Sequence, residues 1–356
     1  MTTNDPATAA PASSPPPGRR RRVVTFLAIA SWIAAGLWTA LAVYFAASFP
    51  LWLRVPAAFA ILVLFVMALR RSDGVAFGVL PCARRWAFAA VAFTVTHAAY
   101  YFLVATPDPN QDWAEDHARV PAVEFDGDLV RVRDVRSFDW RPDGSYKPEF
   151  FDAVYDVRKI NSMDFVVAPF SPESMVAHVF VCFGFSDGQR VAVSVEGRRL
   201  RGQPYSPLGS LFRKHQLIYV VGDERDVIGV RAAVWKQRVQ LYPGRSTDER
   251  KQALFVDMMR RADSLEEHPE FYNLITNNCM NNILRHLRVL GGRRLPSELS
   301  VLLTGLSDRV AFDLGFIDTD LPFAKARAFF RADGRIRRYI DDPDFSRRIR
   351  RLSVPQ

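Results

Sequence analysis

Residues 23–47 contain no charged side chain. Because a bilayer-spanning helix needs about 20 predominantly apolar residues, this segment predicts a transmembrane helix. Residues 51–69 and 86–105 are interpreted as two further spans, with Arg54 reaching the interface and Pro56 in the first helical turn. The first run is too long for a cleaved signal peptide, and more apolar segments follow it.

Arginines are distributed unevenly around these three segments. Arg19 to Arg22 precede the first segment, and the link between the second and third segments is flanked by Arg70, Arg71, Arg84 and Arg85. The link between the first and second segments carries little charge. The positive-inside rule then places the N-terminus in the cytoplasm. An odd number of spans predicts a multi-pass protein of the bacterial inner membrane with a periplasmic C-terminal domain.

The formal net charge is +9. Part of this excess is explained by the arginines that set the topology, and the rest would face anionic phospholipid headgroups. No nucleic-acid recognition module is legible in the sequence. We therefore expect a membrane partner and no nucleic acid.

Composition divides the chain into four predicted regions. Residues 1–22 form a disordered cytoplasmic tail, residues 23–105 a three-helix transmembrane anchor, residues 106–295 a periplasmic cysteine-dependent catalytic domain, and residues 296–356 a C-terminal helical extension. Strands are expected over 123–135 (a hairpin), 165–167, 179–185, 191–196 and 217–221, and helices over 247–265 and 279–290. Strands followed by helices predict an α+β fold.

A predicted helix begins at Cys279, directly after three residues that suit a helix N-cap: Thr276, Asn277 and Asn278. The unpaired N–H groups and the macrodipole at a helix N-terminus favour a thiolate, which is the nucleophilic form of cysteine. The same region could stabilise an oxyanion. Cys279 is therefore the candidate nucleophile, with Thr276, Asn277 and Asn278 in support.

Five histidines lie beyond residue 106, and a nucleophilic cysteine needs a base. His286 would lie about 10 Å further along the helix of Cys279, too far to reach the thiol. Exposure is the expectation for His117, His215 and His268. His178, which begins a predicted strand, is the remaining candidate.

The predicted hairpin after His178 brings in a carboxylate. A three-residue loop at Ser186 to Gly188 would place Glu196 opposite His178, about 5 Å away on the same face. Glu196 would then orient the imidazole, as the third member of a catalytic triad does. A two-residue loop would oppose His178 to Gly197 instead, and Glu196 would then suit a surface ion pair with Arg198 or Arg199.

Cys182 and Cys279 could alternatively form a disulfide, because the predicted compartment is oxidising. Cys182 lies about 13 Å along the strand from His178, and a disulfide needs Cα atoms within about 7 Å. The disulfide and the catalytic pair therefore exclude each other, and we favour catalysis. Cys182 is expected to be a buried strand residue and Cys82 to be inert. No metal site or cofactor is expected, since the Cys-x-x-Cys spacing is absent.

These residues resemble the Lnb N-terminal periplasmic domain family, whose namesake is a lipoprotein N-acyltransferase. The resemblance covers about residues 112–290 through several separated motifs: Ala177-His178, Ser194-Val195-Glu196, Tyr205-Ser206-Pro207, residues 217–226 and Thr276 to Cys279. It implies a permuted papain-like (NlpC-type) fold, with an antiparallel sheet and packed helices, in which His precedes Cys. It also implies an acyl-thioester mechanism. Met280 departs from the pattern, because a polar residue is expected there.

The resemblance implies that Cys279, activated by His178, takes an acyl chain from a phospholipid and passes it to an amine such as a lipoprotein N-terminus. A cysteine peptidase or amidase acting on cell-wall peptide is the alternative enzyme. A non-enzymatic, membrane-tethered binding module with a structural Cys279 is the third hypothesis.

Overall fold

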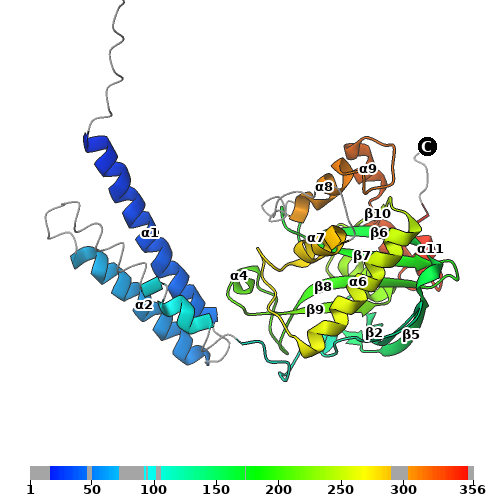
Figure 1. Cartoon of the computed structure of the whole chain (residues 1–356), viewed down its shortest axis with the longest axis horizontal. Coiled ribbons are helices and arrows are strands. Elements are labelled where there is room, and N and C mark those ends of the chain that lie inside the picture. Colours follow the sequence, from blue (N-terminus) through cyan, green and yellow to red (C-terminus); the bar gives the residue numbers. More distant parts are fainter. Residues whose placement is uncertain are drawn as a thin grey trace, which may run out of the picture. The chain divides into compact units, whose positions relative to one another are not determined.

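The computed structural model describes residues 17–45, 50–71, 92–93, 95–101, 106–172, 174–289 and 304–351. The chain divides into two compact units, Met1–Thr106 and Pro107–Gln356 (Figure 1). The predicted boundary between residues 295 and 296 lies outside the described residues, and so does Cys82.

The described part of the first unit includes the helices α1 (Pro17–Phe45) and α2 (Leu51–Arg71), which pack against each other. The indole N–H of Trp32 on α1 donates to the carbonyl of Phe65 on α2 over 3.1 Å, and the two rings are 5.4 Å apart. The third predicted span, residues 86–105, falls largely outside the described residues.

The prediction of three transmembrane helices is wrong. Among the residues that the structure describes, no helix has both the length and the apolar character that crossing a bilayer requires. Helix α1 includes Arg19 to Arg22 and α2 includes Arg54 and Arg70, so each apolar stretch is shorter than its helix. The multi-pass topology was derived from these segments, and no described helix supports it.

The second unit is an α+β fold built on a mixed sheet of eight strands. The strand order is β1-β2-β9-β8-β7-β6-β10, with β5 paired to β2. Only the β2–β9 contact is parallel, through the single pair Arg136 and Gly222. The strands are β1 (Ala122–Asp126), β2 (Leu129–Arg136), β5 (Phe150–Asp156), β6 (Ile160–Pro169), β7 (Ala177–Phe185), β8 (Arg190–Arg198), β9 (Gln216–Gly222) and β10 (Gln240–Pro243). A separate two-stranded sheet pairs β3 (Asp139–Trp140) with β4 (Tyr146–Lys147).

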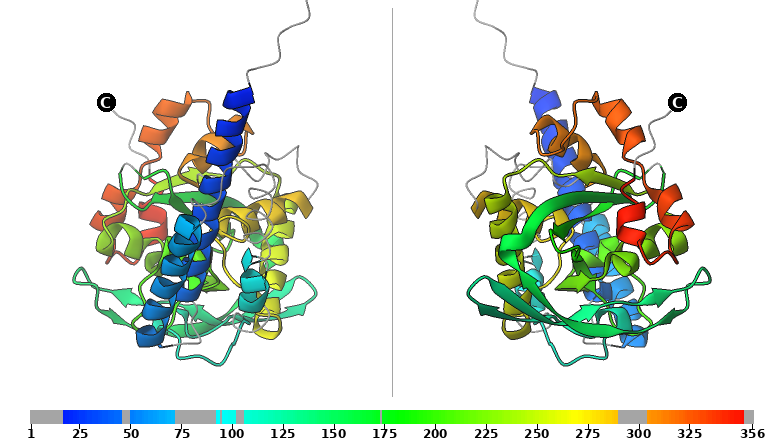
Figure 2. Two further views of the ribbon diagram at one scale, coloured as in Figure 1. Left: turned by 90° about the vertical axis from the view of Figure 1, so that its left-hand side faces the viewer. Right: turned by 90° about the vertical axis from the view of Figure 1, so that its right-hand side faces the viewer.

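Helices cover both faces of the large sheet, and each side has its own buried apolar cluster. Figure 2 shows α6, in yellow, and the C-terminal helices, in red, on opposite sides of the green strands. One face packs against α6 (Asp248–Glu267) and α7 (Cys279–Val289). The other packs against α5 (Glu224–Val227), the π-helical turn η4 (Val230–Val234), α10 (Asp333–Arg338) and α11 (Phe345–Arg348). Short helical segments complete the unit: η2 (Glu115–His117), η3 (Val157–Lys159), α4 (Pro207–Ser210), η6 (Thr304–Leu306), α8 (Ser307–Asp313) and α9 (Phe323–Phe329).

The local predictions for strands and helices are confirmed in this unit. The expected hairpin is β1–β2, and Gly127 at its turn has a φ of 60°. The two expected helices are α6, whose N-cap Thr247 accepts from the N–H of Arg250, and α7. The strands β5 and β10 had no sequence prediction.

Candidate active site

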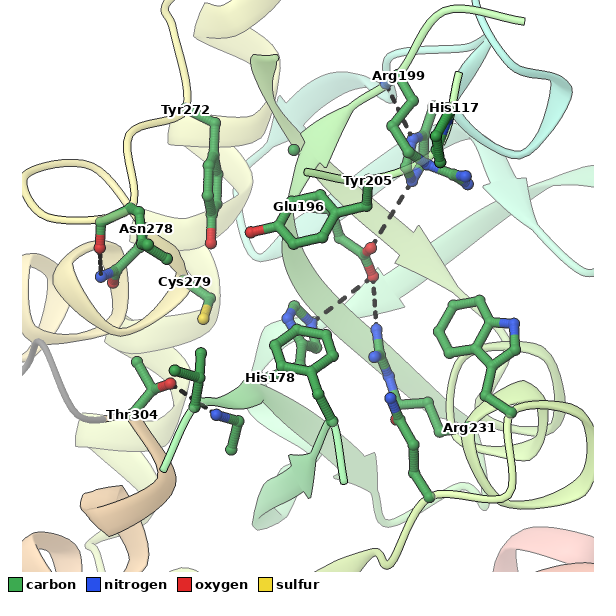
Figure 3. A pocket seen from close by; sticks show the side chains of 18 residues that line it. His117, His178, Glu196, Arg199, Tyr205, Arg231, Tyr272, Asn278, Cys279 and Thr304 are labelled. Carbon is green, nitrogen blue, oxygen red and sulfur yellow. Dashed lines mark hydrogen bonds and ion pairs between the residues drawn. The ribbon is translucent and has the colours of Figure 1, made fainter. Parts of the chain in front are cut away.

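A cavity of about 380 Å³ lies at one end of the large sheet. The antiparallel order brings the end of β6, the start of β7, the end of β8 and the start of β9 to this edge. Helix α7 begins beside them. Residues from all these segments line the cavity, among them His178, Glu196, Tyr205, Arg231, Tyr272 and Cys279 (Figure 3).

Cys279 is the first residue of α7, as predicted. Asn278 is the N-cap: its side-chain oxygen accepts from the N–H of Asn281 over 2.8 Å, and the Asn281 side chain accepts from the N–H of Asn278 over 3.1 Å. This reciprocal pair is a capping box in which asparagine replaces the usual Glu or Gln. The cap fixes where the helix begins and thereby places Cys279 at its N-terminus.

The Cys279 side chain is buried, and Figure 3 shows its sulfur directed into the cavity. The hydrogen-bonded ladder between β7 and β8 ends at Phe180 and Ser194, so the next backbone N–H on β7, that of Val179, is available to the sulfur. Burial raises the pKa of the Cys279 thiol, although the N–H groups of Val179 and Met280 act in the opposite direction. The resting side chain is therefore a neutral thiol.

The strand register predicted for β7 and β8 is confirmed. The N–H of Phe185 donates to the carbonyl of Gln189, and Gly188 has a φ of 92°, so the loop has three residues. Phe180 pairs with Ser194, and the same register continued by two residues places His178 opposite Glu196. The His178 Nε2 and Glu196 Oε1 atoms are 3.6 Å apart.

Ser194 connects His178 to Glu196. Its Oγ lies 2.7 Å from the His178 Nε2 and donates to the Glu196 Oε1 over 2.8 Å. A hydroxyl has a single proton to donate, and an ionised carboxylate only accepts. Ser194 therefore accepts from His178, which places the imidazole proton on Nε2. The Nδ1 lone pair remains for the Cys279 thiol, toward which Figure 3 shows the ring to face.

The protonation states agree with this arrangement. Burial, with a smaller contribution from Arg231, lowers the pKa of His178 to about 3, so the imidazole is neutral at pH 7. Burial also disfavours the ionised Glu196, but Arg231, His178 and His117 together outweigh it and hold the pKa of Glu196 well below its ordinary value. The site thus contains a neutral thiol, a neutral imidazole and a carboxylate.

Two further residues hold Glu196, and the sequence analysis identified neither of them. Arg231, on η4, donates to the Glu196 Oε1 over 2.8 Å, and its guanidinium lies over the Phe180 ring. His117 is buried, with its Nε2 3.7 Å from the Glu196 Oε2, so the prediction that His117 is exposed was wrong. Glu196 is not in a surface ion pair with Arg198 or Arg199, because its partner is Arg231.

The three predicted support residues occupy different positions. Asn278 lines the cavity, but Thr276 is exposed and neither Thr276 nor Asn277 is among the lining residues. The Asn277 side chain instead holds the loop before α7, donating to Glu270 and to the carbonyl of Phe271. The Met280 side chain packs in the apolar core, and its N–H reaches Cys279. A backbone donor is thus present at the position where the sequence departs from the family pattern.

Three further histidines of the second unit do not line the cavity. His215 is fully buried, and its Nε2 accepts from the N–H of Ser206 over 3.2 Å, so the prediction of an exposed His215 was wrong. His286 does not line the cavity and bonds the Tyr219 hydroxyl and the Asp257 carboxylate, both within 2.8 Å. His268 is exposed, as predicted.

Both Cys182 and Cys279 are free thiols. Cys182 belongs to the apolar cluster on one face of the sheet, and Cys279 belongs to the cluster on the other. The sheet separates the two sulfurs, which disagrees with the disulfide hypothesis.

Comparison with known proteins gives one match. Residues 146–305 match the model of the family described as the Lnb N-terminal periplasmic domain, which confirms the resemblance found in the sequence. The match includes His178, Ser194, Glu196 and Cys279, but it begins after His117. No curated protein and no solved structure matches the chain.

Proposed function

Through residues 146–305 the chain belongs to the Lnb N-terminal periplasmic domain family, and from this premise we propose that it is a cysteine acyltransferase. The observation that carries the proposal is the arrangement of Cys279 and His178, which face one cavity while Ser194 and Glu196 hold the far side of the imidazole. A nucleophile, a base and a group that orients the base are the parts that acyl transfer needs.

In the proposed first step, the Cys279 sulfur attacks the carbonyl carbon of a phospholipid ester. His178 Nδ1 takes the thiol proton as the C–S bond forms, because both groups are neutral in the resting site. The imidazole then returns this proton to the leaving glycerol oxygen as the C–O bond breaks. The products are a Cys279 thioester and a lysophospholipid.

In the second step an amine attacks the thioester, and His178 mediates the transfer of the amine proton to the leaving Cys279 sulfur. The products are an amide and the free thiol. In both steps the imidazolium is transient, and the Glu196 carboxylate stabilises it through Ser194 and directly at 3.6 Å. The backbone N–H groups of Val179 and Met280 at the sulfur are placed to stabilise charge developing there.

The lining of the cavity suits an acyl ester. One part of the wall is apolar and aromatic, with Phe170, Val176, Leu274 and Trp235, and the other carries Arg199 and Arg231. The acyl chain of an ester is complementary to the apolar part. Arg231 is paired with Glu196 and Arg199 with Asp116, so the second part of the wall is polar with its charges balanced. A phospholipid donor and an amine acceptor, such as a lipoprotein N-terminus, are accordingly the substrates we propose.

The family is described as a periplasmic domain, which supports a periplasmic location for this domain. With a phospholipid as donor, we propose that the protein acts at the periplasmic surface of the inner membrane. Cell fractionation tests this location: recovery of the native protein in the outer-membrane or cytoplasmic fraction would contradict it.

The test of the activity is the intact mass of the full-length protein after incubation with phospholipid. We expect a hydroxylamine-labile mass increase of one acyl group, absent from Cys279→Ala and present in Cys182→Ala, which removes the other buried thiol. Transfer of the label to an added amine completes the proposed reaction. Release of free fatty acid alone, or cleavage of cell-wall peptide without any adduct, would replace acyl transfer by hydrolysis.

A further inference from the structure

Exposed apolar side chains concentrate around the mouth of the cavity. The described part of the second unit exposes nine large apolar side chains, and six of these line the cavity or belong to the segments that do. We call these six the rim: Phe170, Met175, Leu208, Trp235, Ile275 and Leu306. The other three, Phe125, Phe151 and Val154, lie on β1 and β5.

The topology explains why the rim residues meet. Phe170 and Met175 lie in the β6–β7 connection, and Leu208 lies in α4 between β8 and β9. Trp235 follows η4, Ile275 precedes α7, and Leu306 belongs to η6. These segments all reach the sheet edge where the cavity opens. The contacts between segments agree: the N–H of Gly305 donates to the carbonyl of Met175, and the Thr304 hydroxyl accepts from the N–H of Ala177. Segments far apart in the sequence therefore present their apolar side chains at one opening.

The charged residues of these segments are mostly basic, and their one acidic residue, Glu173, lies outside the residues that the structure describes. In the described parts of residues 170–176, 204–214, 235–238, 271–278 and 304–306, the charged side chains are Arg213, Lys214, Lys236 and Arg238. Lys236 and Arg238 are exposed and flank the cavity-lining residue Gln237. An apolar surface with an exposed Trp and basic neighbours suits the interface of an anionic bilayer. There the indole ring is buried among the lipid acyl chains, and the basic side chains contact the anionic headgroups.

We propose that the rim docks the mouth of the cavity onto an anionic phospholipid bilayer. This proposal rests on the proposed function, because docking at the rim would let a phospholipid ester pass from the bilayer to Cys279 without crossing water. The bilayer is favoured over a protein partner because the segments that carry the apolar rim also carry four basic residues and only one acidic residue, Glu173.

The first test is amide hydrogen exchange of the full-length protein with and without phosphatidylglycerol vesicles, since this readout is local and separates the rim from the helices of the first unit. We expect slower exchange over residues 204–214 and 271–278, and unchanged exchange over β1 and β5. Unchanged rim segments would overturn the proposal. Protection that depends on protein concentration without vesicles would assign the rim to contact between copies of the chain and also overturn it.

The second test compares acyl donors in vesicles with short-chain soluble esters. The variant Met175→Gln/Leu208→Gln/Ile275→Gln changes residues outside the cavity lining, and Phe125→Gln/Phe151→Gln/Val154→Gln is a control of similar exposure. We expect the rim variant to lose at least about tenfold of its acylation rate from vesicles, to retain its rate with soluble ester, and the control to retain both. Lys236→Gln and Arg238→Gln should each weaken the preference for anionic vesicles about fivefold.

The two proposals fail in different ways. If the rim is protected by vesicles but no ester acylates Cys279, the proposed function fails and the docking surface stands. If Cys279 is acylated but the rim variant has the same ratio of vesicle to soluble rates as the wild type, the docking surface fails and the function stands.

Discussion

Arg231 Nη2 lies 2.8 Å from the Oε1 of Glu196, and both side chains are largely buried. Removal of one partner leaves a buried charge without compensation, which costs about 3–5 kcal/mol. We expect Arg231→Met to lower the free energy of unfolding by this order and to raise the pKa of Glu196. Denaturant unfolding measures the first effect.

The double variant Arg231→Met/Glu196→Gln separates this pair from general damage to the core. It removes both charges, so its stability should recover a large part of the loss seen in Arg231→Met. If the double variant loses as much stability as Arg231→Met and Glu196→Gln lose together, the two effects are additive, which would contradict a direct charge pair.

Ser194→Ala should slow the acylation of Cys279 about tenfold to a hundredfold, because the imidazole loses the partner that places its proton on Nε2. The half-saturating donor concentration should change little, since Ser194 is not among the residues lining the cavity. Single-turnover kinetics separate the two parameters. Ser162→Ala on strand β6 of the same sheet is the control, because the Ser162 Oγ has no hydrogen-bond partner. An equal loss in both variants would assign Ser194 a packing role only.

The sequence contained part of the information about this site. The loop at Ser186 to Gly188 correctly predicted the register that opposes His178 and Glu196, because turn chemistry is local. The period of two along the same strand also places Ser194 on the face of Glu196, a signal that was present but not used.

Arg231 and His117 could not be predicted in the same way. Arg231 follows Glu196 by 35 residues and approaches it from a π-helical turn, a long-range contact without a local signature. The prediction for His215 was wrong because Arg213 and Lys214, which precede it, suggested an exposed segment, whereas the fold turns the His215 side chain into the core. The transmembrane prediction was made from uncharged runs in the sequence, and no helix among the described residues is long and apolar enough to cross a bilayer.

The rate of alkylation of Cys279 by iodoacetamide should keep increasing with pH above the pH at which an ordinary thiol is fully ionised. The reason is that burial raises the pKa of Cys279 while His178 remains neutral. We expect the rate to increase about tenfold per pH unit between pH 7 and 9, as a mostly protonated thiol requires. Mass spectrometry of the modified peptide measures the rate in Cys182→Ala, where Cys279 is the remaining described thiol. A rate that stays constant from pH 5 to 8 would indicate a thiolate–imidazolium pair instead.

The free energy of unfolding should decrease as the pH falls below about 6.5, because burial lowers the pKa of both His178 and His215 to about 3. Between these limits the unfolded chain binds a proton that the folded chain does not, which costs about 1.4 kcal/mol per pH unit for each histidine. His215→Gln keeps an acceptor for the N–H of Ser206 and removes one titrating group, so its stability should depend on pH less steeply by that amount. Denaturant unfolding at pH 7, 6 and 5 measures the slope. If His215→Gln and the wild type lose stability equally, His215 is protonated in the folded protein.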